Sequence, residues 1–266
     1  MATSNLPGDG EVRLGSVTLP AGRRVRNLPG NPVAWATIQP VAQAGRVWST
    51  LSGMIGQTGL APVLLAGLRG SATRPWDEGE FDYPADISGL DHLDAANVLA
   101  AGWEDSVPGE DEQAEEDTDA AAELAPFSWG FPGLAMPGPT RLSEADLQPV
   151  LDALPAARVG LIPAARPADA LPLLGWTGAG NHYQDALPLA AVLRSWEDRF
   201  GARLLQVGFA EIRLLVERPP RDVQSAERVA AEHYAFCDEC GGKGLTTISE
   251  ISINLVNAPI WTFWWD

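Results

Sequence analysis

Two histidines and two cysteines in the second half of the chain are the residues whose types and spacing could do chemistry. His233, Cys237 and Cys240 stand at i, i+4 and i+7, a spacing that places all three on one face of a continuous helix. Imidazole nitrogen and thiolate sulfur are preferred ligands of zinc, which binds four of them in a tetrahedron. With His182 from a separate loop, the set predicts a candidate zinc site made of His182, His233, Cys237 and Cys240.

The same residues allow two other interpretations. A thiol beside a histidine can act as a nucleophile, so a hydrolase or metal-dependent enzyme would use Asn181, His182, His233 and Cys237 as its catalytic group. The other interpretation is structural. Ala226, Val229 and Ala230 share the predicted helix face, which would make Cys237 a small core residue and His233 a core histidine.

The elements that must position these residues can be predicted from the hydrophobic pattern. The pattern predicts a mixed α/β chain of the α+β class, with small mixed sheets covered by amphipathic helices and a βαβ-like unit near the N-terminus. The last strand has large apolar side chains on both faces, so we expect both of its faces to be covered. The expected strands are 11–17, 33–38, 62–66, 158–162, 203–207, 212–217 and 259–265, and the expected helices are 40–55, 91–103, 143–154, 167–175, 185–200, 225–240 and 248–256.

An acidic stretch divides the chain. Ten carboxylates and no Lys or Arg lie between Glu104 and Glu123. Such a segment buries too little apolar surface to offset its chain entropy, so we expect a mobile linker; recruitment of a basic partner is the functional alternative. The sequence therefore predicts an N-terminal α/β domain over 1–103, a linker over 104–138 and a C-terminal α+β domain over 139–266. Trp76 and Trp129, in loop-like stretches, are candidate surface anchors.

Composition and charge exclude several classes of function. The formal net charge of −17 repels phosphate backbones and anionic membranes, so no nucleic-acid or membrane partner is expected. Residues 1–10 lack a signal-peptide pattern, and no stretch approaches the roughly 18 apolar residues of a membrane span, so we expect a cytoplasmic protein. Gly242-Lys243-Gly244 lacks the spacing of a phosphate-binding P-loop.

The second half of the chain resembles a bacterial family known as domain of unknown function 4253. The resemblance rests on seven blocks: 158–163, 166–170, 174–176, 181–182, 192–201, 230–237 and 261–266. Longer members of the family are also similar in three blocks of the first half: 58–60, 62–65 and 74–80. Where the family pattern has Cys-Pro-Asp, this chain has Cys237-Asp238-Glu239-Cys240, so a metal role for Cys240 is not implied by the resemblance. The resemblance implies a bacterial α+β domain and no particular activity.

Many aromatic residues, an acidic surface and the absence of a recognisable reaction centre favour a non-enzymatic protein-interaction module, regulatory or immunity-like. Its expected partner is another protein, and the acidic charge favours a basic one. The alternative remains the hydrolase or metal-dependent enzyme, with zinc as the candidate ion.

Overall fold

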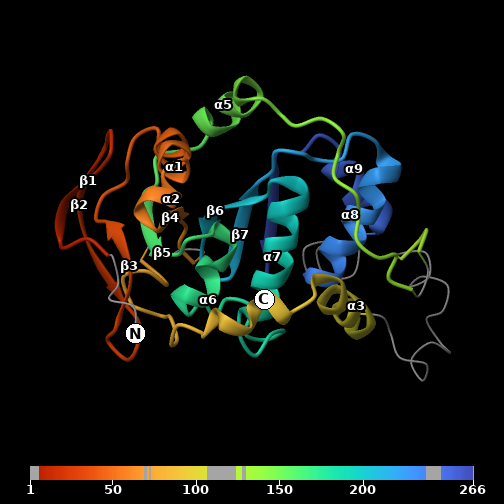
Figure 1. The fold of residues 1–266 in the computed structure, drawn as a ribbon, viewed down its shortest axis with the longest axis horizontal. Helices are drawn as coiled ribbons and strands as arrows, with labels where there is room; N and C mark the ends of the chain where they lie inside the picture. Colours follow the sequence, from red (N-terminus) through yellow and green to blue (C-terminus); the bar gives the residue numbers. More distant parts are fainter. Residues whose placement is uncertain are drawn as a thin grey trace.

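The computed structural model describes residues 6–68, 71, 73–106, 124–127, 130–237 and 247–265. The described residues form one eight-stranded mixed sheet with the strand order β1-β2-β3-β5-β4-β6-β7-β8 (Figure 1). The strands are β1 (Gly10–Leu14), β2 (Val17–Arg26), β3 (Pro32–Thr37), β4 (Leu60–Leu65), β5 (Arg158–Pro163), β6 (Arg203–Val207), β7 (Glu211–Leu215) and β8 (Ile260–Trp264). The predicted α+β class is confirmed, but the strands form one sheet in place of several small ones.

The helices lie between β3 and β8 in the sequence, and most are close to their predicted positions. They are α1 (Ala44–Ser52), α2 (Ile55–Thr58), α3 (Ala95–Ser106), α5 (Glu144–Asp152), α6 (Ala170–Leu174), α7 (Leu187–Phe200), α8 (Val223–Phe236) and α9 (Ile248–Leu255), with 3-10 turns η1 (Ile87–His92) and η2 (Pro167–Asp169). The predicted capping box at Ser143 is present, since its side chain accepts the N–H of Asp146 while the Asp146 carboxylate accepts the N–H of Ser143. The predicted stop at Gly201 is also present, with φ of 61°.

Strand β5 joins the two halves of the chain. It pairs antiparallel with β3 through Trp35 and Leu161, and antiparallel with β4 along its whole length from Arg158 to Pro163. The two predicted domains, 1–103 and 139–266, therefore contribute strands to the same sheet. β3 and β4 run in the same direction because both oppose β5, so the predicted βαβ-like unit exists with one strand inserted between its two strands.

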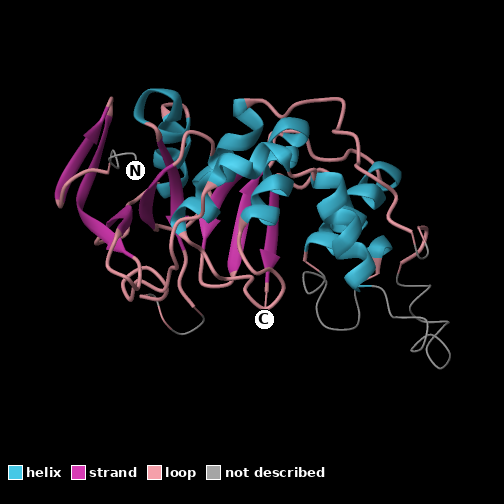
Figure 2. Cartoon of the chain, turned by 60° about the horizontal axis from the view of Figure 1, so that its bottom comes forward, coloured by secondary structure: helices cyan, strands magenta, loops and turns pink. Residues whose placement is uncertain are grey.

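Helices cover both faces of the sheet (Figure 2). Val63 and Leu64, adjacent in β4, point to opposite faces and belong to two different apolar clusters. The cluster around Leu64 includes Trp48 of α1 and Leu151 of α5, whereas the cluster around Val63 contains residues of α3, α6, α7 and α8. This second cluster holds the last strand and most of the aromatic residues.

The last strand departs from its prediction. Among the described strands, β8 pairs with β7 alone and therefore lies at the edge of the sheet. Trp261, Phe263 and Trp265 are buried on one face, while Thr262 and Trp264 on the other face are exposed, Trp264 by 42%. Ile260, at the start of β8, packs against an apolar cluster on this second face, but Thr262 and Trp264 remain exposed, so the prediction that both faces are covered is wrong.

Three other expectations concern the acidic stretch and the aromatic residues. Most of the predicted acidic linker, 107–123, lies outside the described residues, as does Trp129. Trp76 is buried, and its indole N–H donates to the carbonyl oxygen of Val207 at 3.2 Å, so it is a core residue and not a surface anchor. No helix in the described part of the chain has the length and apolarity to cross a membrane.

Candidate functional site

His233 lies in the last turn of α8 and points into the core. Asp222 caps this helix by accepting the N–H of Ser225 at 2.8 Å. His233 lies on the buried face of the helix. Its ring centroid lies 5.2 Å from that of Trp196, 4.6 Å from Trp261 and 4.7 Å from Phe263. The side chain is 5% exposed, and burial lowers the pKa of His233 from 6.5 to about 3. His233 is therefore a neutral imidazole inside an aromatic cage.

Cys237 follows α8 and is also buried. Its backbone has φ of −159° and ψ of 88°, so the helix has ended and the predicted single helix face does not continue through this residue. Its sulfur lies 3.0 Å from the carbonyl oxygen of Trp264 and is disulfide-bonded, so in this state it offers no free thiol. Cys240, the fourth predicted zinc ligand, lies outside the described residues.

Asn181 and His182 are exposed on a compact loop, residues 177–186, that connects α6 to α7. The N–H groups of His182 and Tyr183 both donate to the carbonyl oxygen of Ala179, at 3.0 and 2.9 Å. The Tyr183 hydroxyl donates to the carbonyl oxygen of Phe236 at 3.0 Å, which ties the loop to the carboxyl end of α8. The loop that carries Asn181 and His182 therefore lies beside the carboxyl end of α8.

The side chains nevertheless occupy different environments. His182 lines an open cavity, whereas His233 is enclosed by aromatic rings. Within the described residues, no three His, Cys, Asp or Glu side chains are grouped so that they could hold a metal ion, and this includes His182, His233 and Cys237. Because Cys240 is not described, the four-ligand zinc site remains a prediction, as does the catalytic group built on Asn181.

The cavity beside His182 is the largest feature of this region. It has a volume of about 470 Å³ and lies between α3, the first turn of α7, the 177–186 loop and the carboxyl end of α8. We call it the α3–α8 groove. Its lining residues are Val98, Ala101, Gly102, Asp105, Ser106, His182, Tyr183, Pro188, Ala235 and Phe236. The walls are mainly apolar, and the polar side chains lie at the loop and at the end of α3.

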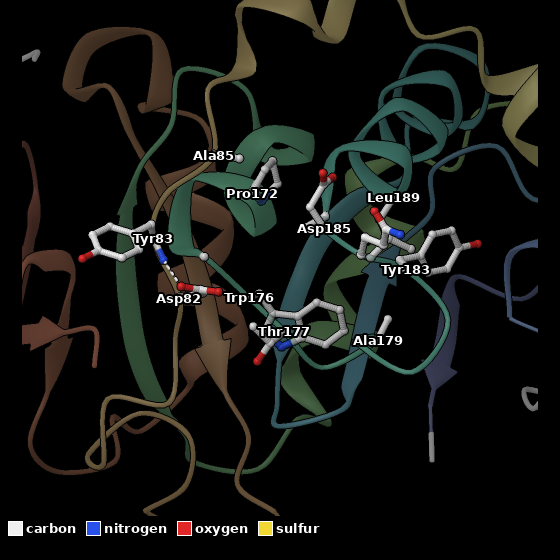
Figure 3. A pocket seen from close by; sticks show the side chains of 14 residues that line it. Asp82, Tyr83, Ala85, Pro172, Trp176, Thr177, Ala179, Tyr183, Asp185 and Leu189 are labelled. Carbon is white, nitrogen blue, oxygen red and sulfur yellow. Dashed lines mark hydrogen bonds between the residues drawn. The ribbon is translucent and has the colours of Figure 1, made fainter. Parts of the chain in front are cut away.

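A second, smaller hollow lies on the other side of the same loop. Its volume is about 90 Å³, and Tyr183 lines both this hollow and the groove. Figure 3 shows Asp82, Asp185 and Trp176 around it, while the ring of Tyr83 points away from the other side chains. The indole N–H of Trp176 donates to the carbonyl oxygen of Gly208 at 2.9 Å, which fixes the ring beside the carboxyl end of β6.

The close approach of two helices forms the groove. A Cβ atom at Gly102 of α3 would lie 2.1 Å from the carbonyl oxygen of Ala235 in α8, so only glycine permits this contact. Sequence reasoning found the loop at Asn181 and His182 but missed Ala101, Asp105 and Phe236. Asp105 was assigned to the linker, although it lies in the last turn of α3, and the one available signal was the glycine inside a predicted helix.

Arrangements that support catalysis need a nucleophile or base oriented by a partner within hydrogen-bond reach. The groove contains His182 as its only imidazole, and the sulfur and second imidazole of the predicted catalytic group are buried away from its walls. The geometry is that of an open, apolar-walled binding groove beside a polar loop.

No curated protein and no solved structure matches the chain. A family model matches residues 158–266, the segment that supplies β5 to β8 with α6 to α9, whereas α3 and the first four strands precede it. The family whose model matches this segment is described as Domain of unknown function (DUF4253).

Proposed function

We propose that this is a cytoplasmic, non-enzymatic protein-interaction module, of a regulatory or immunity-like kind, that holds its partner at the α3–α8 groove. The groove carries the proposal. It is open, measures about 470 Å³ and has walls of Val98, Pro188 and Phe236, which suit an inserted side chain of another protein.

The environment of His233 favours binding over hydrolysis. A general base must exchange protons with a substrate, and a metal ligand must reach its ion. His233 is enclosed by Trp196, Trp261 and Phe263, and its Nε2 atom is buried without a hydrogen-bond partner. This packing supports a core role for the imidazole that the alternative enzyme would need at its centre.

Affinity capture with three forms of the full chain tests the proposal. Ala101 is exposed on α3 and lines the groove, so Ala101→Trp fills it without changing charge. Asn97→Trp adds the same ring to an exposed position of the same helix outside the groove and serves as the control. We expect at least one protein from a lysate of the source organism to be retained by the unsubstituted chain and by Asn97→Trp, and lost from Ala101→Trp.

That protein is then purified and its binding to each of the three forms measured by calorimetry. If no retained protein depends on Ala101, or if direct binding is the same for all three forms, the groove is not an interaction site and the proposal fails.

A further inference from the structure

We infer that the α3–α8 groove recognises a basic segment of its partner, with the aliphatic stem of a lysine or arginine against the groove wall and the cationic head at its acidic end. This inference rests on the proposed function and adds the chemistry of the partner.

The carboxyl ends of two helices meet at the groove. α3, of 12 residues, ends at Ser106, and α8, of 14 residues, ends at Phe236, and both of these residues line the groove. A helix carboxyl end carries a partial negative charge, which favours cations. Here only uncharged hydroxyl groups donate to the last carbonyl oxygens among the described residues, from Tyr234 to Ser106 at 3.4 Å and from Tyr183 to Phe236 at 3.0 Å. The last turn of α3 contains no basic residue, and the only basic type in the last turn of α8 is His233, which burial keeps neutral. Within the described residues, therefore, no Lys or Arg lies in the last turn of either helix.

Several carboxylates in the described part of the chain have arginine partners. Arg158 pairs with Asp77, Arg194 with Asp169, and Arg199 with Glu232. Among the described residues, by comparison, no ion pair involves Asp105, which lines the groove, or Asp82 and Asp185, which line the adjacent hollow. The described residues that line the two cavities include no Lys or Arg.

The amino end of α7 does not cancel this negative charge. It would ordinarily attract an anion, but the Asp185 carboxylate already accepts the N–H of Leu187 at 2.8 Å. Among the described residues, the negative charge at the groove therefore comes from Asp105 and two helix carboxyl ends, an arrangement that is complementary to a basic partner.

The apolar walls select among cations. Lys and Arg can lay their methylene stems along apolar surface while keeping the charged head in water. Val98, Pro188 and Phe236 offer such a surface, and Asp105 and Ser106 lie at the end of α3 where the head would emerge. A basic segment that also carries apolar side chains fits the groove better than a purely charged one.

Fluorescence anisotropy of three short dye-labelled peptides, titrated with the full chain at physiological salt, tests this inference. In the first peptide arginine alternates with leucine, in the second serine replaces leucine, and in the third glutamate replaces arginine. We expect the arginine–leucine peptide to bind most tightly and the glutamate peptide not to bind. Ala101→Trp should weaken the arginine–leucine peptide at least about tenfold, on the scale of losing a buried anchor.

A second variant separates groove recognition from general attraction to an acidic protein. Asp105→Asn removes a charge at the groove and should weaken binding about fivefold, the scale of one exposed ion pair. Glu11→Gln removes the same charge from an exposed position on β1, at the opposite edge of the sheet, and should change binding less than about twofold. Equal effects of Asp105→Asn and Glu11→Gln, or unaltered binding by Ala101→Trp, would overturn the inference.

The two proposals can fail separately. A captured protein whose binding depends on Ala101 but is unaffected by Asp105→Asn would leave the interaction function standing and would remove the basic partner. Absence of any Ala101-dependent protein, together with absence of peptide binding, would remove both.

Discussion

The cage around His233 predicts how stability changes with pH. Burial lowers the pKa of His233 in the folded protein to about 3, whereas the ordinary value of 6.5 applies to the unfolded chain. Between these values the unfolded chain binds a proton that the folded protein excludes. The stabilisation is therefore complete above about pH 6.5 and is lost progressively as the pH falls toward 3.

The size of the effect follows from the two pKa values. Lowering the pH from 7.5 to 5.0 should cost about 2 kcal/mol of unfolding free energy through this one imidazole, since each unit of difference is worth about 1.4 kcal/mol. Urea unfolding of the unsubstituted chain and of His233→Phe at both pH values measures it. Phenylalanine keeps an aromatic ring against Trp196, Trp261 and Phe263 but cannot bind a proton.

We expect the unsubstituted chain to lose about 2 kcal/mol more than His233→Phe over this pH range, because other titrating groups are common to both. His92→Gln provides the matched control, since His92 is exposed and its replacement removes a solvated imidazole. Equal pH dependence of the unsubstituted chain and His233→Phe would show that the imidazole is solvated or hydrogen-bonded in the folded protein, and would reopen the catalytic interpretation.

Three further predictions test the surroundings of the site. Glu232 is fully buried and accepts hydrogen bonds from Arg199, Trp196 and Ala135, so Glu232→Gln should lower the unfolding free energy in urea by about 3 to 5 kcal/mol, and a loss below about 1 kcal/mol would contradict this account. Truncation after residue 258 removes three buried aromatic residues of the C-terminus and should give insoluble protein; a soluble chain with cooperative thermal unfolding would show that strand β8 is dispensable. Elemental analysis before and after chelation tests the predicted four-ligand zinc site: one equivalent of zinc whose removal lowers the melting temperature would support it, and purified protein without zinc would contradict it.

Local signals in the sequence predicted the elements well. The helix ends predicted at residues 143 and 200 lie within one residue of the observed ends of α5 and α7, where Ser143 caps one helix and Gly201 follows the other. These signals are reliable because each reports a hydrogen bond or backbone conformation made within a few residues. The segment 107–123 cannot be compared, because it lies outside the described residues.

The order of the strands was not predictable in the same way. Nothing in the pattern of Arg158–Pro163 shows that it pairs with β3 and β4, which precede it by about a hundred residues. The exposure of Trp264 was not predicted for a related reason, since an apolar strand has the same sequence pattern at the centre of a sheet as at its edge.

The same distinction between local spacing and distant packing applies to the candidate site. A spacing of four residues would place His233 and Cys237 on one face of a continuous helix, but α8 ends at Phe236. The face that carries His233 packs into the core against Trp196 and Trp261. Whether a polar residue on a helix faces solvent or core is decided by what the helix packs against, and that information lies in distant strands.

The groove itself depends on two parts of the chain that are far apart in sequence. Its loop and two of its helices belong to the DUF4253 segment, residues 158–266, but the wall carrying Ala101 and Asp105 is α3, which precedes that segment. α3 can approach α8 closely only because position 102 is glycine, opposite the backbone of Ala235. The acidic end of the groove is thus supplied from outside the family segment and its apolar floor from within it. Variation in α3 could accordingly change the partner without altering the fold of the domain, which is how a common scaffold serves different interactions.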